Sequence, residues 1–251
     1  MKRILSTLLF FCTIISLNAQ QKKLITEIKS THTNEVIQFK YNSKNQLTYF
    51  DEKGVITYRE FTLKYDKKTD ILTECIINQD RGEFMSNSKY NYENPEYIIQ
   101  ETKTGGKKNS IKTTENSKIF IDNEGRLEKT ILDGKPWEVF SYDERDNLIK
   151  YTVYSASEKM DQDSEYTFDS KKSILSNMEN LPNWFWTLHM NNMKWCSEFI
   201  GENNAIENTT EFAKFSATTI EITYDYDGDG YPVKQYYDGK LVKEFKYKTI
   251  D

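Results

Sequence analysis

The sequence predicts an all-β protein: an antiparallel up-and-down meander of repeated β-hairpins, forming an open curved sheet or a closed barrel, with one short helical or loop insert. Three observations support this. A short pattern recurs, with two aromatic or apolar residues two apart, then Asp or Asn, a turn, and Leu or Ile. A second turn type, rich in Asp-Gly, falls between these units. One tryptophan-rich stretch matches neither pattern.

The first 19 residues have the features of a secretory signal. Two basic residues precede an apolar run from Ile4 to Leu17 that is too short to span a bilayer, and Ala19 supplies a small residue at its end. We therefore predict a signal peptide at residues 1–19. A single domain at residues 20–251 would follow, in an exported protein that is periplasmic or extracellular.

The composition is typical of a folded, water-soluble protein. Only 37% of the residues are hydrophobic, yet 17 Tyr and 14 Phe provide large areas to bury. A disordered chain would contain few aromatic residues. The net charge of -5, with acidic and basic residues interleaved, argues against general nucleic-acid binding. No later segment approaches the roughly 20 apolar residues of a membrane helix, so we expect no membrane span.

The repeat has a physical explanation. Residues two apart on a strand point to the same face, so each aromatic pair indicates a half-buried strand. The Asp or Asn that follows can hydrogen-bond the backbone of a turn. Four residues after the last aromatic or apolar residue stand Asn45, Gly125, Asp146 and Gly230, types that tolerate a left-handed backbone. Lys172 holds this place in the sixth unit, which predicts a longer or distorted loop there. The seven units begin at Phe39, Leu63, Tyr90, Ile119, Phe140, Tyr166 and Tyr224.

The second turn type occurs at Asp133-Gly134 and Asp238-Gly239, with Gly54 and Gly82 in similar roles. Asp-Gly between alternating strands is a strong signal for a two-residue hairpin. Two alternating turn classes predict a meander of roughly a dozen strands. Because neighbouring units would share one aromatic face, we expect stability to come from their stacking and not from a central core.

Two units carry a family resemblance. Tyr142-Asp143 to Leu148 and Ile121-Asp122 to Leu127 resemble the YD repeats of the RHS group of secreted bacterial proteins. Residues 220–232 are similar to the closing unit of a bacterial family of exported proteins of unknown function. The resemblance covers residues 35–248 and implies a secreted repeat architecture. RHS proteins wrap very many repeats around a toxic cargo, which seven units cannot enclose, so that activity is not carried over.

The insert, at about residues 176–212, matches no hairpin and holds three of the four tryptophans. Helix-like spacing of its aromatic residues, with Pro182 at a suitable start, predicts a short helix or compact loop lying on the sheet. Its aromatic side chains either cap the open end or concave face of the meander, or form a platform for a sugar, peptide or protein partner. The candidate ligand-binding residues are Trp184, Phe185, Trp186 and Trp195.

Motifs for catalysis are missing from the sequence: it has no G-x-S-x-G, phosphate-binding glycine loop or HExxH, so we name no catalytic residue and no cofactor. Asp225, Asp227 and Asp229 match the opening of a calcium loop, but Tyr236 stands where a bidentate Glu belongs. We therefore predict an ordinary turn, with calcium as a weak alternative.

Two cysteines and a histidine are the remaining candidates for a disulfide, a metal site or a nucleophile. Cys75 and Cys196 follow the signal, and the sequence leaves open whether they pair or are buried small apolar residues. His189 lies near Cys196 without a further ligand or orienting group, which predicts a packed histidine beside a buried cysteine.

These observations favour an exported, non-enzymatic binding or scaffold protein that uses the repeat sheet and the tryptophan-rich insert. A glycan or an envelope protein is the partner class we expect. One alternative is an enzyme at the insert acting on polysaccharide or cell-envelope material. The other, suggested only by the RHS-like repeat, is a component of an interbacterial toxin or immunity system.

Overall fold

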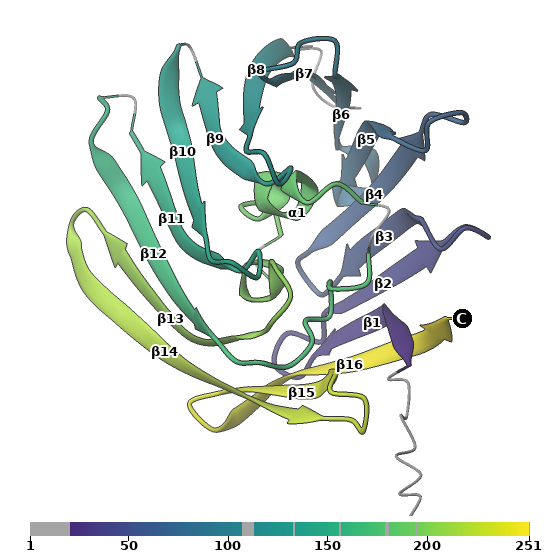
Figure 1. Ribbon diagram of the computed structural model, residues 1–251, viewed down its shortest axis with the longest axis vertical. Helices are drawn as coiled ribbons and strands as arrows, with labels where there is room; N and C mark the ends of the chain where they lie inside the picture. The colour runs from purple at the N-terminus through teal and green to yellow at the C-terminus, as the bar shows by residue number, and fades with distance from the viewer. Residues whose placement is uncertain are drawn as a thin grey trace, which may run out of the picture.

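The structure, a computed structural model, describes residues 21–106, 113–132, 134–155, 157–178, 181–193 and 195–250. The predicted signal peptide and Asp133 lie outside these residues. The described part forms a closed barrel in which every strand is antiparallel to its neighbours and β1 pairs with β16 (Figure 1). This confirms the all-β meander with a short helical insert, and closure removes the exposed edges that an open sheet would have. The strands are β1 (Lys22–Ser30), β2 (Val36–Tyr41), β3 (Leu47–Lys53), β4 (Tyr58–Tyr65), β5 (Leu72–Gln79), β6 (Phe84–Asn91), β7 (Ile98–Gly105), β8 (Thr113–Ile121), β9 (Leu127–Leu132), β10 (Lys135–Tyr142), β11 (Leu148–Tyr154), β12 (Met160–Phe168), β13 (Ala205–Phe212), β14 (Phe215–Tyr226), β15 (Pro232–Tyr237) and β16 (Lys240–Ile250).

The repeat units all turn at the same end of the barrel, which we call the corner end, where each even-numbered strand leads into the next odd-numbered one. In the corner between β10 and β11, the Asp143 Oδ1 atom accepts the backbone N–H groups of Arg145 and Asn147 at 2.8 and 3.0 Å. The same side-chain cap forms at Asn42, Asp122 and Asp227. The residues predicted to be left-handed have φ between 60° and 83°; they are Asn45, Gly125, Asp146 and Gly230.

Tyrosines of the repeat connect several units to the part of the wall that precedes them. The Tyr142 hydroxyl donates to the Leu127 carbonyl at 2.9 Å, and the Tyr65 hydroxyl donates to the Leu47 carbonyl at 2.7 Å. Burial raises the pKa of both hydroxyls, so they stay protonated and act as donors. This bond explains why the pattern contains Tyr as well as Phe. Equivalent bonds are made by Tyr41, Tyr92, Tyr224 and Tyr247.

The sixth corner opens into the insert. Asp169 Oδ1 accepts the backbone N–H of Lys171 at 2.9 Å, as in the other corners, but its second donor is the distant Asn204 N–H at 3.1 Å. The Asp169 N–H in turn donates to the Asn204 carbonyl at 3.0 Å. The chain therefore leaves the barrel after β12 and returns at Asn204, which confirms the longer loop expected at Lys172.

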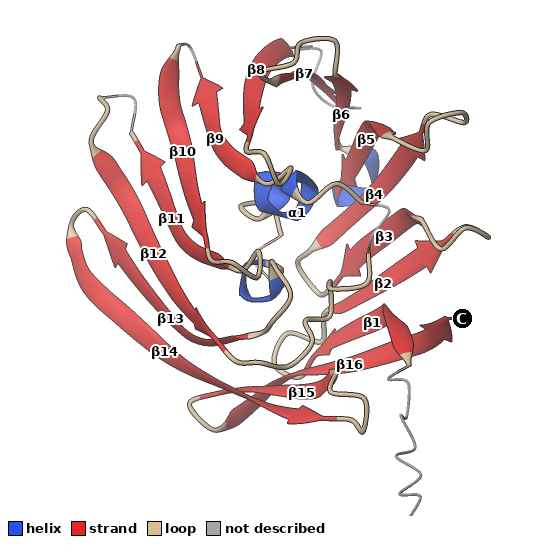
Figure 2. Cartoon of the chain, viewed as in Figure 1, coloured by secondary structure: helices blue, strands red, loops and turns tan. Residues whose placement is uncertain are grey.

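We call residues 169–204 the plug. The plug ends earlier than the predicted insert, because residues 205–212 pair with β12 and β14 as β13. It contains α1 (Trp184–His189) and a short 3-10 helix, η2 (Ser197–Phe199). Helix α1 lies at the centre of the ring of strands (Figures 1 and 2).

The plug builds a central core inside the barrel. Trp186 lies 5.5 Å from Phe50 between ring centroids, and Trp195 lies 5.7 Å from Phe39, so wall and plug aromatics form one buried cluster. This differs from the expectation that neighbour stacking alone would stabilise the fold. The reason is that a closed wall encloses a volume, which the inserted segment fills with its own apolar side chains.

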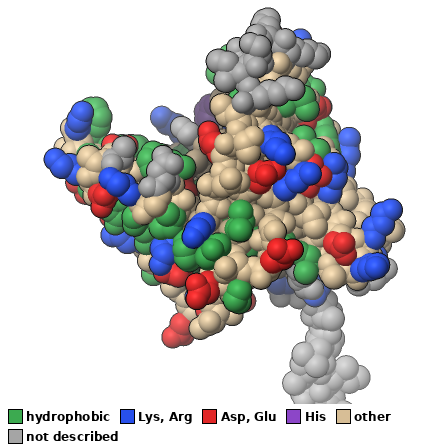
Figure 3. Space-filling model, turned by 90° about the horizontal axis from the view of Figure 1, so that it is seen from above, with side chains coloured by type: hydrophobic (Ala, Val, Ile, Leu, Met, Phe, Trp, Pro, Cys, Tyr) green, Lys and Arg blue, Asp and Glu red, His purple; other side chains and the backbone are tan. Residues whose placement is uncertain are grey.

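The outer face of the wall is charged. Lys150 on β11 forms ion pairs with Asp163 and Glu165 on β12, each at 2.8 Å. The adjacent Tyr151 is buried and its hydroxyl donates to Asn191 of the plug at 2.9 Å, so alternate residues face inward. Figure 3, which looks at the molecule from above the view of Figure 1, shows basic and acidic side chains interleaved on that surface.

The opposite end, which we call the hairpin end, carries exposed apolar side chains at its tips. Here odd-numbered strands lead into even-numbered ones. Asp238 and Gly239 both have positive φ, 47° and 75°, as the predicted two-residue hairpin requires. The exposed apolar residues at these tips are Val55, Ile56, Phe84, Met85, Leu132, Trp137, Phe212 and Phe215.

Candidate functional site

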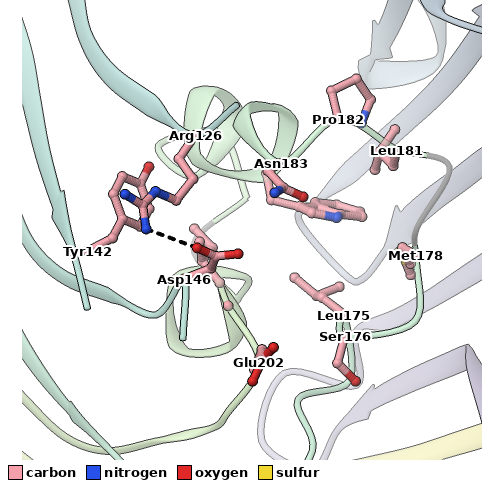
Figure 4. A pocket seen from close by; sticks show the side chains of 13 residues that line it. Arg126, Tyr142, Asp146, Leu175, Ser176, Met178, Leu181, Pro182, Asn183 and Glu202 are labelled. Carbon is pink, nitrogen blue, oxygen red and sulfur yellow. Dashed lines mark hydrogen bonds and ion pairs between the residues drawn. The ribbon is translucent and has the colours of Figure 1, made fainter. Parts of the chain in front are cut away.

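A cavity of about 210 Å³ lies between the plug and the corner end of the barrel (Figure 4). The wall contributes side chains from two neighbouring corners, β8–β9 and β10–β11, and the plug contributes the rest. The lining side chains used below are Arg126, Tyr142, Asp146, Leu175, Met178, Leu181, Trp186 and Glu202.

The floor of the cavity is apolar and is formed by the plug. Leu175, Met178, Leu181 and Trp186 are all buried and belong to the same hydrophobic cluster. A series of tight turns sets their positions: the Met178 N–H donates to the Leu175 carbonyl at 3.1 Å, and the Leu181 N–H donates to the Met178 carbonyl at 2.9 Å. These turns lead directly into α1. The indole N–H of Trp186 has no hydrogen-bond acceptor among the described residues.

Arg126 forms the charged side of the cavity. Its guanidinium pairs with Asp122 at 2.7 Å. It also pairs with Asp146 at 2.9 Å (Figure 4). It also lies 5.0 Å from the centroid of the Tyr142 ring. The tyrosine hydroxyl donates to Leu127 of the wall and contacts the Thr187 hydroxyl of α1 at 3.2 Å. The two corners are thus joined to each other and to the plug helix.

The last segment of the plug places Glu202 at the same cavity. Gly201 has a φ of +118°, and a Cβ added there would lie 2.4 Å from the Asn147 Cα, so only glycine fits this approach. The next residue, Glu202, donates its backbone N–H to the Arg145 carbonyl at 3.2 Å. The Asn203 N–H donates to Asn147 Oδ1 at 2.9 Å, which fixes this segment against the β10–β11 corner.

The four predicted ligand-binding residues are buried. Phe185 is fully enclosed, and Trp184, Trp186 and Trp195 are 3%, 5% and 7% exposed. They do not form an open platform on the surface. The alternative, that these aromatics cap the concave face of the meander, describes their position. Of the four, Trp186 alone also lines the cavity.

His189 and Cys196 are packed in the plug. The His189 Nε2 atom lies 3.1 Å from the Tyr90 hydroxyl, and burial lowers the pKa of this imidazole to about 4, so it is neutral at neutral pH. Burial raises the pKa of the Cys196 thiol, which lies 3.7 Å from the Trp186 carbonyl, so the reactive thiolate is disfavoured. Cys196 and Cys75 are both buried and free, so they do not form a disulfide.

The aspartates of the calcium-like motif have other partners. Asp227 caps its corner, and Lys23 forms ion pairs with Asp227 and Asp229 at 2.8 and 2.6 Å. Asp225 accepts a hydrogen bond from Tyr236 at 2.7 Å. No cluster of three or more His, Cys, Asp or Glu side chains suited to a metal ion occurs in the part of the chain that the structure describes. The arrangement matches the ordinary turn that was predicted.

Two buried glutamates attach the plug to the wall away from the cavity. Glu138 of β10 accepts hydrogen bonds from Thr130 at 2.9 Å and from Asn191 of the plug at 2.5 Å. Glu198 of the plug accepts a bond from Gln235 at 2.6 Å and pairs with Lys243 at 3.3 Å. Both groups are engaged with their neighbours, so we assign them a structural role.

Three cavity residues were not predicted from the sequence to line a site. Arg126, Asp146 and Glu202 are ordinary charged residues in turns, and the chain has 39 acidic residues in all. A local signal exists only for Asp146, which was predicted to be left-handed but not to line a site. Their convergence depends on pairing between strands and on the path of the plug.

Comparison with known proteins gives a fold and no family. No protein-family model and no curated protein matches the sequence. In the described residues, no helix has the length and apolar character needed to cross a membrane. Among solved structures, the chain is similar to a porin-like protein from Bacteroides uniformis, with 16% identity, coverage of 92% of this chain and 98% of that chain, and a TM-score of 0.51. At this level of identity, the similarity shows a shared barrel architecture.

Proposed function

We propose that this protein is an exported binding protein without catalytic activity, and that its ligand enters the cavity between the plug and the corner end. The observation that carries the proposal is the cavity itself, about 210 Å³ with a buried apolar floor, an indole ring and a charged side. Ligand sites are typically concave and mostly apolar, with a few polar groups that fix orientation. Rigid strands and capped corners hold the lining groups, as a preorganised site requires.

The filled lumen and the charged outer wall support a binding role in water. Wall and plug aromatics occupy the interior where a channel would run. A membrane-spanning barrel presents an outward apolar band about 25 Å tall. The outer face here instead carries ion pairs such as Lys150 with Asp163 and Lys64 with Glu74. These features favour a periplasmic or extracellular location.

The resemblance to YD repeats is part of the proposal as architecture. In the corner between β10 and β11, Tyr142 bonds the preceding unit and Asp143 caps the turn. These roles explain why the two residue types stand side by side. We infer that the repeat serves here as a closed scaffold around a plug.

Intrinsic tryptophan fluorescence tests the binding site. The mature protein is titrated with soluble glycans, cell-envelope fragments and small charged or neutral organic compounds. We expect a saturable change that Trp186→Phe abolishes. The matched control is Trp184→Phe, because Trp184 is buried in the same helix but does not line the cavity. A response that survives in Trp186→Phe and is lost in Trp184→Phe would refute the assignment to this cavity.

A further inference from the structure

We propose that the cavity accepts an aliphatic ammonium group, the chemistry shared by a lysine side chain and a small free amine. This inference rests on the proposed binding function and specifies its ligand class. It is carried by three features of the cavity: an arginine already paired with carboxylates, an excess of carboxylates, and an indole ring over which no cation lies among the described residues.

Arg126 is not free to bind an anion. Its guanidinium pairs with Asp122 at 2.7 Å, Asp146 at 2.9 Å and Glu124 at 3.3 Å. Its Nη1 atom also donates a hydrogen bond to the Asp143 carbonyl at 3.3 Å. One face lies over the Tyr142 ring. Its charge and four of its five N–H donors are therefore used within the protein, and the positive charge at the cavity is already compensated.

Carboxylates remain in excess around the cavity. The charged residues that line the cavity are Asp146, Glu202 and Arg126, and two carboxylates with one guanidinium give a formal charge of -1. Glu202 lines the cavity, and its carboxylate forms no ion pair with any of the described residues. Arg145, in the same β10–β11 corner as Asp146, is exposed and does not line the cavity. A ligand with positive charge would be attracted to this side of the cavity.

Trp186 supplies a ring for a cation. Indole is the strongest of the aromatic side chains in cation–π interactions. In the described residues, each cation that lies over a ring lies over Tyr or Phe, and the Tyr142 ring in this cavity is already covered by Arg126. Trp186 lines the same cavity as Asp146 and Glu202.

The apolar floor and the volume define the rest of the ligand. Leu175, Met178 and Leu181 would contact methylene groups, as the stems of lysine side chains do at apolar surfaces. A volume of about 210 Å³ exceeds the roughly 150 Å³ of an apolar cavity that holds a six-carbon ring. An n-pentylammonium ion, with five carbons and one nitrogen, fits this space.

Calorimetric titration of the full mature protein tests the inference with three probes of one shape: n-pentylammonium, n-pentanol and pentanoate. We expect the ammonium to bind at least about 10-fold more tightly than the alcohol, and pentanoate not to bind. Glu202→Gln should weaken ammonium binding about 5- to 10-fold. The control Glu207→Gln, on the outward face of β13, should leave it unchanged.

The possible outcomes separate the two proposals. Equal or tighter binding of pentanol or pentanoate would overturn the ammonium assignment and leave the binding function standing. Failure of every probe, together with no Trp186 response to the wider panel, would overturn both. If Glu202→Gln does not fold, the comparison of the three probes on the natural protein still tests whether the cavity prefers an ammonium group.

A second titration distinguishes the source of the ammonium group. Acetyl-Gly-Lys-Gly-amide carries the same group on a peptide. Tighter binding of this peptide than of n-pentylammonium indicates a lysine of a protein partner, and tighter binding of n-pentylammonium indicates a free amine.

Discussion

The two ends of the barrel are built differently. At the corner end, Asp and Asn side chains cap the turns, tyrosine hydroxyls connect neighbouring units, and the plug packs against the wall. At the hairpin end, short turns project side chains such as Phe215 and Trp137 into solvent. Both ends belong to one antiparallel ladder, so strand pairing alone does not account for the difference.

The comparison shows where an insertion can be accommodated. Asp169 keeps its cap by accepting from Asn204 in place of a residue of a tight turn. The corner is therefore closed across a long excursion, and the barrel pairing of β12 with β13 is preserved. The same excursion provides the core of the barrel and one side of the cavity, so stability and binding are coupled at the corner end.

The largest expected effect comes from removing a plug aromatic. Phe185 is fully buried and lies 4.7 Å from His189 and 5.3 Å from Trp186 between ring centroids. Phe185→Ala should lower the free energy of unfolding by about 3–5 kcal/mol in urea denaturation. Trp137→Ala, at the hairpin end, should change it by less than about 1 kcal/mol. Equal losses at the two sites would contradict the difference between the ends.

A pH effect of intermediate size is expected from Glu52, which is buried on β3 beside Arg59 and Trp195. Burial raises the pKa of this carboxyl from its ordinary 4.5 to about 7, more than the attraction of Arg59 lowers it. The folded state therefore binds the proton more tightly than the unfolded state does. The stability that this provides is present below about pH 4.5 and is lost as the pH rises through 7.

Urea denaturation at pH 5 and pH 8 measures this loss. For a pKa shift of this size, ionisation of Glu52 should lower the free energy of unfolding of the natural protein by up to about 3 kcal/mol over the full pH range of the titration. In Glu52→Gln, the part of this decrease in unfolding free energy that comes from Glu52 should be missing. The control Glu144→Gln, in an exposed corner position, should show the same pH dependence as the natural protein. An unchanged pH dependence in Glu52→Gln would show that Glu52 does not titrate in this range.

The smallest expected effect concerns one corner cap. Asp143→Ala removes the acceptor for two backbone N–H groups and should lower the free energy of unfolding by about 1–2 kcal/mol. Glu144→Ala in the same corner should have almost no effect, since Glu144 is exposed. Thermal unfolding of the two variants makes the comparison. A loss from Glu144→Ala as large as that from Asp143→Ala would mean that the cap does not stabilise the corner.

Much of the fold was predictable because its signals are local. The left-handed residues Asn45, Gly125, Asp146 and Gly230 were identified from residue type and spacing, and the structure confirms all four. Strand β13 was missed because Asn208 and Thr210 occupy inward positions where apolar residues would mark a strand. The sequence therefore assigned these residues to the insert and predicted roughly a dozen strands.

The position of the plug and the cavity was not predictable from the sequence. Helix α1 was expected to lie on a sheet, but whether the sheet closes depends on the pairing of β1 with β16, which no local pattern records. The cavity joins Arg126 and Asp146 of the wall to Glu202 of the plug. These residues meet only because the plug returns at the corner end.

Fluorine NMR of the protein labelled with 5-fluorotryptophan tests the central claim most directly, because the chain has 4 Trp residues distributed between the plug and the hairpin end. Each resonance is assigned with a Trp→Phe variant, and n-pentylammonium is then added. We expect a saturable shift of the Trp186 resonance, with the Trp137 resonance unchanged. A shift of Trp137 with Trp186 unaffected would place binding at the hairpin end and contradict the account.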